Sequence, residues 1–356
     1  MRVGLTLYGS LDGQSGGFRY DRRLVEGLRD AGDTVDVIEL PRRKYARGLL
    51  DNLSPSLQDR LAVDVDVMLQ DELAHPSLVR ANRDLPYPVV SVVHHLRASE
   101  ERHLAGLYRA VERRYLGGVD AAVCNSTATQ ASVTATGGPP SARTVVAPPA
   151  GDRFDPDIDA ETIASRARDG PLRIAFVGNI EPRKGLDTLV DGLAAVDESW
   201  ELTVVGRAEN PSYVRTVENR IASSGAGNRI DLRGRLADDD LAAVLRDSHV
   251  LAIPARHEGF GIAYLEGMSF GLPAVASAAG GAVDLVTPGE TGALVEPDDP
   301  AAVTRALGAL ARDRDRLARM GQAARERYDS HPDWPETTAR VRAFLANVAG
   351  DGGAVG

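Results

Sequence analysis

The chain has 356 residues and a formal net charge of −10 at pH 7, and this length suits two domains better than one core. With 43% hydrophobic and 26% charged residues, the composition is that of a globular protein and excludes a disordered chain. The acidic balance argues against general affinity for nucleic acid, whose phosphates require a basic surface. The single cysteine, Cys124, excludes an intrachain disulfide and a CxxC metal site.

Targeting signals are absent from the sequence pattern. No run approaches the ~20 apolar residues of a membrane span, and the start MRVGLTLYGS lacks the pattern of a signal peptide. We therefore expect a cytoplasmic protein.

In the first part of the chain, short β-rich runs predict a parallel sheet. The residues 18–33 space their apolar side chains as a helix does, and Gly32 is placed to cap it. The predicted strands are RVGLTLY (2–8), TVDVIEL (34–40), VDVML (65–69), PVVSVVHH (88–95), AAVCNS (121–126) and TVVAPP (144–149).

A polar stretch, residues 150–171, then reads as an interdomain connection with one short helix. After it the alternation restarts. The predicted strands are 172–180, 200–206, 229–234, 249–255, 273–281 and 292–297, and the predicted helices are 186–196, 212–224, 241–248, 262–270, 300–313, 315–329 and 334–348.

Two doubly wound α/β halves in tandem are the predicted architecture. We assign residues 1–155 to a first Rossmann-like domain, completed by a C-terminal helix at about 334–350, and residues 171–330 to a second. Ligands of such sheets bind beyond the carboxyl ends of the strands, so we expect the site in a cleft between the halves.

The stretch HEGFGIAYLEGMSFGLPAV, residues 257–275, holds two glutamates in an apolar, glycine-rich setting. Glu258 follows a predicted strand, and Gly259 and Gly261 bracket the turn into a helix whose free N–H groups suit an anion. Glu266 lies within that helix, ~12 Å at most from Glu258 along its axis. This separation fits two carboxylates that bind different hydroxyl groups of one extended ligand.

The segment EGFGIAYLE resembles the E-x7-E motif of family 4 retaining glycosyltransferases, which have the GT-B fold. The resemblance extends in order over most of the second half and over the first loop and helix. The matching segments are YGSLDGQSGGFRYDRRLVEGLRDAGDTVDV, AFVGNIEPRKGLDTLV, LTVVG, IDLRGRL and GLPAVASAAGGAVDLVTPGETGALVEPDD.

The resemblance implies a role for each matching residue. Lys184 and Arg183 would neutralise the donor diphosphate, Glu258 would contact the transferred sugar, and Glu266 the donor ribose. His94, or the adjacent His95, would match the family's histidine near the donor sugar. The remaining implied donor-binding positions are Gly16, Gly17, Asn179, Gly206, Arg235, Gly259, Phe260 and Gly261.

The implied reaction transfers a hexose from a nucleotide diphosphate sugar to the hydroxyl of a glycan, glycolipid or lipid-linked acceptor, with retention. Charge stabilisation of the leaving diphosphate is the main lever, so we expect no metal and no cofactor. The glutamate spacing disfavours the close carboxylate pair of retaining glycosidases and favours a front-face mechanism. Asn179 departs from the family, which commonly has arginine there, and Arg183 is the candidate substitute.

Other functions fit less well. A nicotinamide-dependent dehydrogenase or epimerase needs a GxGxxG turn that VGNIEPRKG and YGSLDGQSGG do not supply. A catalytically inactive scaffold with the same fold is the main alternative, favoured by Asn179. The pairs Asp64–Asp66 and Asp155–Asp157 could suggest a metal-dependent transferase, but they lie in a predicted strand and in the connection.

The densest basic cluster is PRRKYARGLL, residues 41–50. Its Arg42, Arg43 and Lys44 could contact an anionic membrane or a lipid-linked acceptor, although a solvated loop is the plainer interpretation.

Overall fold

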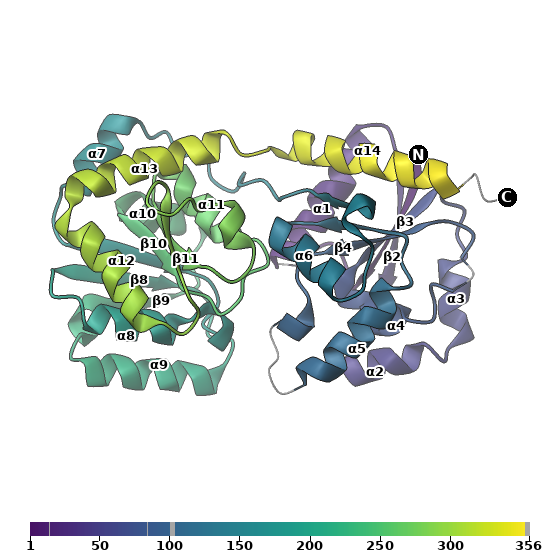
Figure 1. The fold of residues 1–356 in the computed structure, drawn as a ribbon, viewed down its shortest axis with the longest axis horizontal. Coiled ribbons are helices and arrows are strands. Elements are labelled where there is room, and N and C mark those ends of the chain that lie inside the picture. Colours follow the sequence, from purple (N-terminus) through teal and green to yellow (C-terminus); the bar gives the residue numbers. More distant parts are fainter. Residues whose placement is uncertain (14, 84, 100–103, 353–356) are drawn as a thin grey trace. The chain divides into compact units, whose positions relative to one another are not determined.

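The computed structural model describes residues 1–13, 15–83, 85–99 and 104–352. Its internal contacts divide the chain into two compact units. Unit 1 contains Met1–Ala150 and the residues from Pro332 onward, and unit 2 contains Gly151–His331. In each unit a parallel sheet is flanked by helices (Figure 1).

The sheet of unit 1 has six parallel strands in the order β2-β1-β3-β4-β5-β6. Each observed strand overlaps a strand predicted from the sequence, which confirms the first α/β half. The strands are β1 (Arg2–Tyr8), β2 (Thr34–Leu40), β3 (Val67–Asp71), β4 (Val89–Val93), β5 (Ala121–Cys124) and β6 (Thr144–Val146).

Successive side chains of a strand point to opposite faces of the sheet. Both faces are buried here, because side chains of helices pack against each of them. Val3, Leu5 and Leu7 of β1 belong to one core cluster together with side chains of α1 (Gly16–Asp30) and α14 (Trp334–Gly352). Tyr8 belongs to a second cluster, formed with α3 (Pro55–Leu61), α4 (His75–Leu78), α5 (Ala105–Leu116) and α6 (Thr127–Ala135). The predicted Gly32 cap is confirmed, since α1 ends at Asp30 and Gly32 has φ 86°.

The helices from α2 (Tyr45–Asp51) through α6 were not predicted from the sequence. Several span only four to seven residues, which is too short to display a helical period. The expectation of a loop over residues 41–50 is therefore wrong from Tyr45 onward, where α2 begins. Ser126 begins α6, because its side chain accepts a hydrogen bond from the Thr129 N–H.

Unit 2 repeats the architecture with a parallel sheet in the order β12-β11-β10-β7-β8-β9. All of its strands and the helices α8 to α13 overlap predicted ones. The strands are β7 (Leu172–Val177), β8 (Trp200–Val205), β9 (Ile230–Gly234), β10 (Val250–Ile253), β11 (Ala274–Ser277) and β12 (Gly292–Val295). The helices are α7 (Ala160–Ala167), α8 (Leu186–Ala194), α9 (Pro211–Ser224), α10 (Asp238–Asp247), α11 (Ile262–Ser269), α12 (Pro300–Arg312) and α13 (Arg314–Asp329).

The stretch read as a connection is largely part of unit 2. Phe154 is buried in its core, with its ring 5.5 Å from that of Phe270. Arg166 of α7 donates hydrogen bonds to the carbonyls of Phe270 and Gly271 at the end of α11. These contacts fix the stretch against the helix that carries Glu266.

Each strand order contains one point at which the direction of winding reverses. The reversal lies between β1 and β3 in unit 1 and between β7 and β10 in unit 2. Parallel α/β sheets bind ligands at the carboxyl ends of the strands beside such a point. No helix among the described residues is both long and apolar enough to cross a membrane.

Candidate functional site

At the reversal point of unit 2, the segments after β7 and β10 bring Lys184 and Glu258 together. Lys184 ends the short 3₁₀ helix Pro182–Lys184 that follows β7, and Glu258 lies in the segment between β10 and α11. The Lys184 Nζ is 2.6 Å from the Glu258 Oε2, and both side chains are largely buried. Lys184 and Glu258 thus form an ion pair, although the resemblance implies that they contact different parts of the donor, the diphosphate and the sugar.

Arg183 extends this pair into a cluster. Its guanidinium is 3.5 Å from the Glu258 Oε1 and 2.9 Å from the Glu181 Oε1. Glu258 therefore faces two cationic groups. A carboxylate in this position holds both cationic groups in place.

Gly185 allows the turn that carries Lys184. It has φ 67°, in the left-handed region that favours glycine. A β-carbon at this position would lie 2.1 Å from the carbonyl oxygen of Pro254, just beyond β10. Only glycine lets the turn approach the end of β10 closely enough for Lys184 to reach Glu258.

Arg256 fixes the same two segments to each other, and the sequence analysis missed it. Its backbone N–H donates to the Arg183 carbonyl at 2.7 Å, and its guanidinium pairs with Asp187 at 2.8 Å and Asp298 at 2.6 Å. Asp187 also accepts a hydrogen bond from the Tyr213 hydroxyl at 2.6 Å. Although burial raises the pKa of Asp187, the bonds from Arg256 and Tyr213 outweigh it, and the pKa is lowered overall.

The helix α11 carries the second glutamate. It begins after Gly261, whose φ of 94° makes the turn that the sequence predicted. Glu266 is buried, and its Oε2 is 3.5 Å from the guanidinium of Arg153. Arg153 also pairs with Asp238 at 2.7 Å, and the contact between Arg153 and Glu266 was not predicted from the sequence. Phe260 is buried with its ring 5.7 Å from His331, so its side chain serves packing.

Three further predicted residues follow neighbouring strands. Asn179 comes after β7, Gly206 after β8 and Arg235 after β9, all at the carboxyl edge of the sheet. The backbone of Gly206 lies close to that of Gly178 and Asn179. A β-carbon on Gly206 would lie 1.8 Å from the Gly178 carbonyl oxygen and 3.2 Å from the Asn179 nitrogen. The predicted residues of unit 2 thus share one edge, while their roles remain predictions.

In unit 1, the predicted donor-binding residues Gly16 and Gly17 lie in a helix rather than in a loop. Gly16 and Gly17 form the first turn of α1, which Ser15 caps, and this corrects the expectation of a glycine-rich loop at these positions. A β-carbon on Gly17 would lie 3.0 Å from the imidazole Cδ2 of His94. The helix therefore begins directly against the predicted site histidine.

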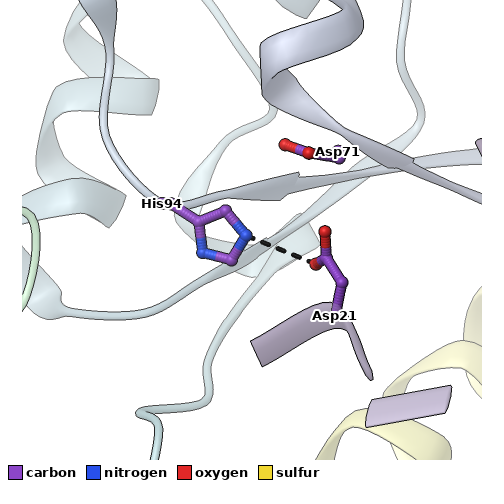
Figure 2. A group of neighbouring side chains, drawn as sticks. All are labelled: Asp21, Asp71 and His94. Carbon is purple, nitrogen blue, oxygen red and sulfur yellow. Dashed lines mark hydrogen bonds and ion pairs between the residues drawn. The ribbon is translucent and has the colours of Figure 1, made fainter. Parts of the chain in front are cut away.

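His94 follows β4 and is held by carboxylates from two other elements. Its Nε2 is 3.3 Å from the Oδ1 of Asp21 on α1, and its backbone N–H donates to the Glu72 Oε2 at 3.0 Å. Asp71, at the end of β3, belongs to the same group (Figure 2). The Tyr20 ring packs edge-on against the imidazole at 5.2 Å. Sequence reasoning found the histidine but none of these partners.

The carboxylates determine the charge of the histidine. Burial by itself lowers the pKa of His94, but the negative charges of Glu72, Asp21 and Asp71 together with the Asp21 hydrogen bond raise it to about 10. Burial and the neighbouring Asp21 and Glu72 raise the pKa of Asp71 well above its usual range. At neutral pH the cluster therefore contains a charged imidazolium beside carboxyl groups.

Asp21, Asp71 and His94 offer donor atoms within 4.8 Å of one another, the one such group found among the described residues. The Nε2 of His94 and the Oδ1 of Asp21 lie 3.3 Å apart as an ion pair. We therefore interpret the cluster as an ion-pair network rather than a metal centre. The first Asp-x-Asp pair is occupied too, because Asp64 and Asp66 both pair with Arg2.

His95, the alternative site histidine, lines a different part of unit 1 together with Glu72. It is half-buried and lines a small cavity with Tyr45, His75 and Glu112. Burial raises the pKa of Glu112 to about 7 and lowers that of His75 to about 4. The two adjacent histidines thus occupy different environments, and only His94 belongs to the carboxylate cluster.

Comparison with known proteins places these features in context. Residues 157–327 match the family described as Glycosyl transferases group 1. The chain is 30% identical over 250 residues to the GDP-mannose-dependent alpha-(1-6)-phosphatidylinositol monomannoside mannosyltransferase of Mycobacterium tuberculosis (strain ATCC 25618 / H37Rv), covering 67% of this chain and 64% of that protein. It is 31% identical over 205 residues to the D-inositol 3-phosphate glycosyltransferase of Corynebacterium efficiens, covering 55% of this chain and 48% of that protein. The chain thus spans less than two-thirds of the length of these relatives.

Two solved structures match nearly the whole chain. Sucrose-phosphate synthase from Thermosynechococcus elongatus has a TM-score of 0.82 at 21% identity, covering 98% of this chain and 99% of that chain. HepE from Anabaena, solved in complex with UDP and glucose, has a TM-score of 0.79 at 19% identity, covering 98% and 100%. The likeness confirms the GT-B fold class predicted from the sequence. Over residues 157–327 the chain is thus similar to glycosyl transferases group 1.

Proposed function

Starting from a chain whose residues 157–327 match glycosyl transferases group 1, we propose that this protein is a retaining, metal-independent glycosyltransferase of family 4. It moves a hexose from a nucleotide diphosphate donor to the hydroxyl of a glycan or a lipid-linked acceptor. The observation that carries the proposal is the cluster of Lys184, Arg183 and Glu258 at the reversal point of unit 2. It combines cations for a diphosphate with a carboxylate for sugar hydroxyls.

The chemistry requires a leaving group that departs as an anion. The bond between the anomeric carbon and the diphosphate oxygen breaks, the acceptor oxygen bonds to the same face of that carbon, and the acceptor proton passes to the leaving phosphate. Lys184 and Arg183 stabilise the charge that develops on the diphosphate. In this scheme Glu258 orients Lys184 and accepts hydrogen bonds from the transferred sugar, while Glu266 and Arg153 form the ribose side of the site.

The substrate panel follows from the names of the relatives. One uses GDP-mannose and a phosphatidylinositol mannoside, another acts on inositol 3-phosphate, and HepE was solved with UDP and glucose. We therefore place GDP-mannose and UDP-glucose first among donors, and inositol phosphates and phosphatidylinositol mannosides first among acceptors.

Donor binding is expected to stabilise the protein against heat. A nucleotide diphosphate at about 100 times its dissociation constant adds ~2.7 kcal/mol, which shifts the Tm by several degrees for domains of this size. The measurement is a thermal denaturation series with UDP, GDP, ADP and their sugars. The Lys184→Ala variant should lose the shift.

The chain provides a matched control, since Lys44 and Lys184 are its only lysines. Lys44→Ala should retain the full shift. If no nucleotide stabilises the folded protein, the proposed donor site is wrong. If a donor binds but no acceptor in the panel supports turnover, the inactive scaffold that Asn179 favours becomes the better description.

Removal of divalent cations is expected to leave transfer unchanged, because Lys184 and Arg183 supply the charge that a metal would supply. The measurement is the initial transfer rate before and after exhaustive treatment with EDTA, with metal content determined in parallel. A rate that collapses with EDTA and returns with one added cation would contradict this, and the Asp21, Asp71 and His94 group would then be the first place to search.

A further inference from the structure

A groove on unit 1 combines apolar and basic side chains. It has a volume of about 460 Å³ and lies between α2, the residues that follow α4, and α5. Its apolar lining is Leu49, Val79, Ala110 and Val111, and its basic lining is Arg80, Arg83 and Arg114. Figure 1 shows α2, α4 and α5 as neighbours.

The three arginines are exposed and have no internal use. Among the residues that the structure describes, none of their guanidinium groups forms an ion pair or a hydrogen bond. Other arginines of this acidic chain, such as Arg153, Arg256 and Arg342, pair with carboxylates. Three unpaired cations around one groove therefore point to an external anion.

Exposed leucines lie on or next to the helices that line the groove. Leu50 and Leu53 are 64% and 69% exposed, and Leu107 is 52% exposed. Leu107 lies on the face of α5 that also carries Ala110, Val111 and Arg114, because these positions follow helical spacing. Leu53 lines an adjacent depression that shares Arg80 and Arg83 with the groove. The apolar surface thus continues beyond the groove on both sides.

We propose that this surface docks unit 1 onto an anionic phospholipid bilayer. The leucines enter the boundary between headgroups and acyl chains, and Arg80, Arg83 and Arg114 contact lipid phosphates, the pairing of charge and apolar area that interfacial binding requires. Exposed leucines favour a lipid surface over a nucleic acid, and the net charge of −10 disfavours the binding of nucleic acid.

The proposal relocates the membrane contact expected from the sequence. Of the cluster Arg42, Arg43 and Lys44, Arg43 is 3.5 Å from Asp51 and is thus partly neutralised within the protein. The groove arginines have no such partner. The inference is independent of the proposed transferase activity, because binding to a bilayer needs neither donor nor acceptor.

The test is flotation of the full chain with vesicles of phosphatidylcholine, with and without phosphatidylglycerol. We expect binding only to the anionic vesicles. The variant Arg80→Ser/Arg83→Ser/Arg114→Ser should lower the partition coefficient on the order of a hundredfold. The variant Leu50→Ser/Leu53→Ser/Leu107→Ser should also weaken binding. All six positions are exposed, and unchanged Tm values verify that the variants fold.

A charge-matched control separates this surface from general attraction. Arg215, Arg316 and Arg319 are exposed arginines of unit 2, and their replacement by serine should leave vesicle binding intact. Failure of the wild-type protein to bind anionic vesicles would overturn the proposal. So would an equal loss in the control variant, or a loss confined to the variant Arg42→Ser/Arg43→Ser/Lys44→Ser.

Discussion

Replacing Lys184 by methionine should lower kcat about 10²–10³-fold, the loss seen when one preorganised donor for a developing anion is removed. Methionine keeps the length and apolar stem of the side chain while it deletes the charge. Because the diphosphate bears more negative charge as it leaves than in the bound donor, we expect kcat to fall more than donor affinity. The measurement is steady-state transfer with the donor that stabilises the protein best.

The ion pair with Glu258 requires a second variant. Removal of Lys184 leaves the largely buried Glu258 carboxylate beside Arg183 without its closer cation, and this alone could disturb the site. If Lys184 merely neutralised Glu258, the double variant Lys184→Met/Glu258→Gln would regain activity. We expect it to stay inactive. The variant Lys44→Met should behave as the wild-type protein, and full activity of Lys184→Met would refute the assignment.

The fold could be predicted from the sequence where its elements are long and strongly patterned. The strands of both sheets are runs of apolar and β-branched residues, and helices such as α9 and α13 show a full helical period. The helices α2 and α3 could not be predicted, since seven residues each contain too few turns to reveal a period. Leu49 and Leu50 of α2 form part of the proposed lipid-docking surface, which could not be predicted from the sequence for this reason.

The candidate site divides in the same way. Glu258 and Glu266 were found from their glycine-rich setting, and Lys184 from the resemblance of its segment to family 4 glycosyltransferases. The contacts of Arg256 with Asp187 and of Arg153 with Glu266 could not be predicted, because each joins residues that are far apart in the sequence. One signal was available: Arg256 directly follows a predicted strand, two residues before Glu258. A basic residue at the carboxyl end of a strand beside a reversal point is a candidate for the site.

The buried cluster in unit 1 shows the limit most clearly. Asp21, Asp71 and His94 come from three separate elements, α1, β3 and the segment after β4. Asp21 looked like one charged residue among many in a helix with the sequence FRYDRRL. Only the packing of α1 against the strand ends shows that this carboxylate is fully buried and faces the imidazole. We therefore assign Asp21 as the residue that positions His94.

Replacing Asp21 by asparagine should reduce kcat by about 10–100-fold near neutral pH, since hydrogen bonds to charged groups contribute roughly 1.5–3 kcal/mol. In the wild-type protein the carboxylates keep His94 charged until the pH approaches its pKa of about 10. Loss of the Asp21 charge and hydrogen bond lowers that pKa. The rate of the variant should therefore fall at a lower pH than the rate of the wild-type protein and recover partly in acid.

Stability gives a second and independent readout. A histidine whose pKa is raised on folding contributes stability that is fully present below its unfolded pKa of about 6.5 and is lost as the pH rises through the folded value of about 10. The difference in unfolding free energy between the wild-type protein and Asp21→Asn should thus be largest at or below pH ~6.5 and narrow toward pH ~10.

NMR titration of the His94 ring gives its pKa directly. Asp30, exposed on the same helix, provides the control Asp30→Asn. A wild-type His94 that titrates at its ordinary pKa would remove the basis for assigning Asp21 any role in positioning it.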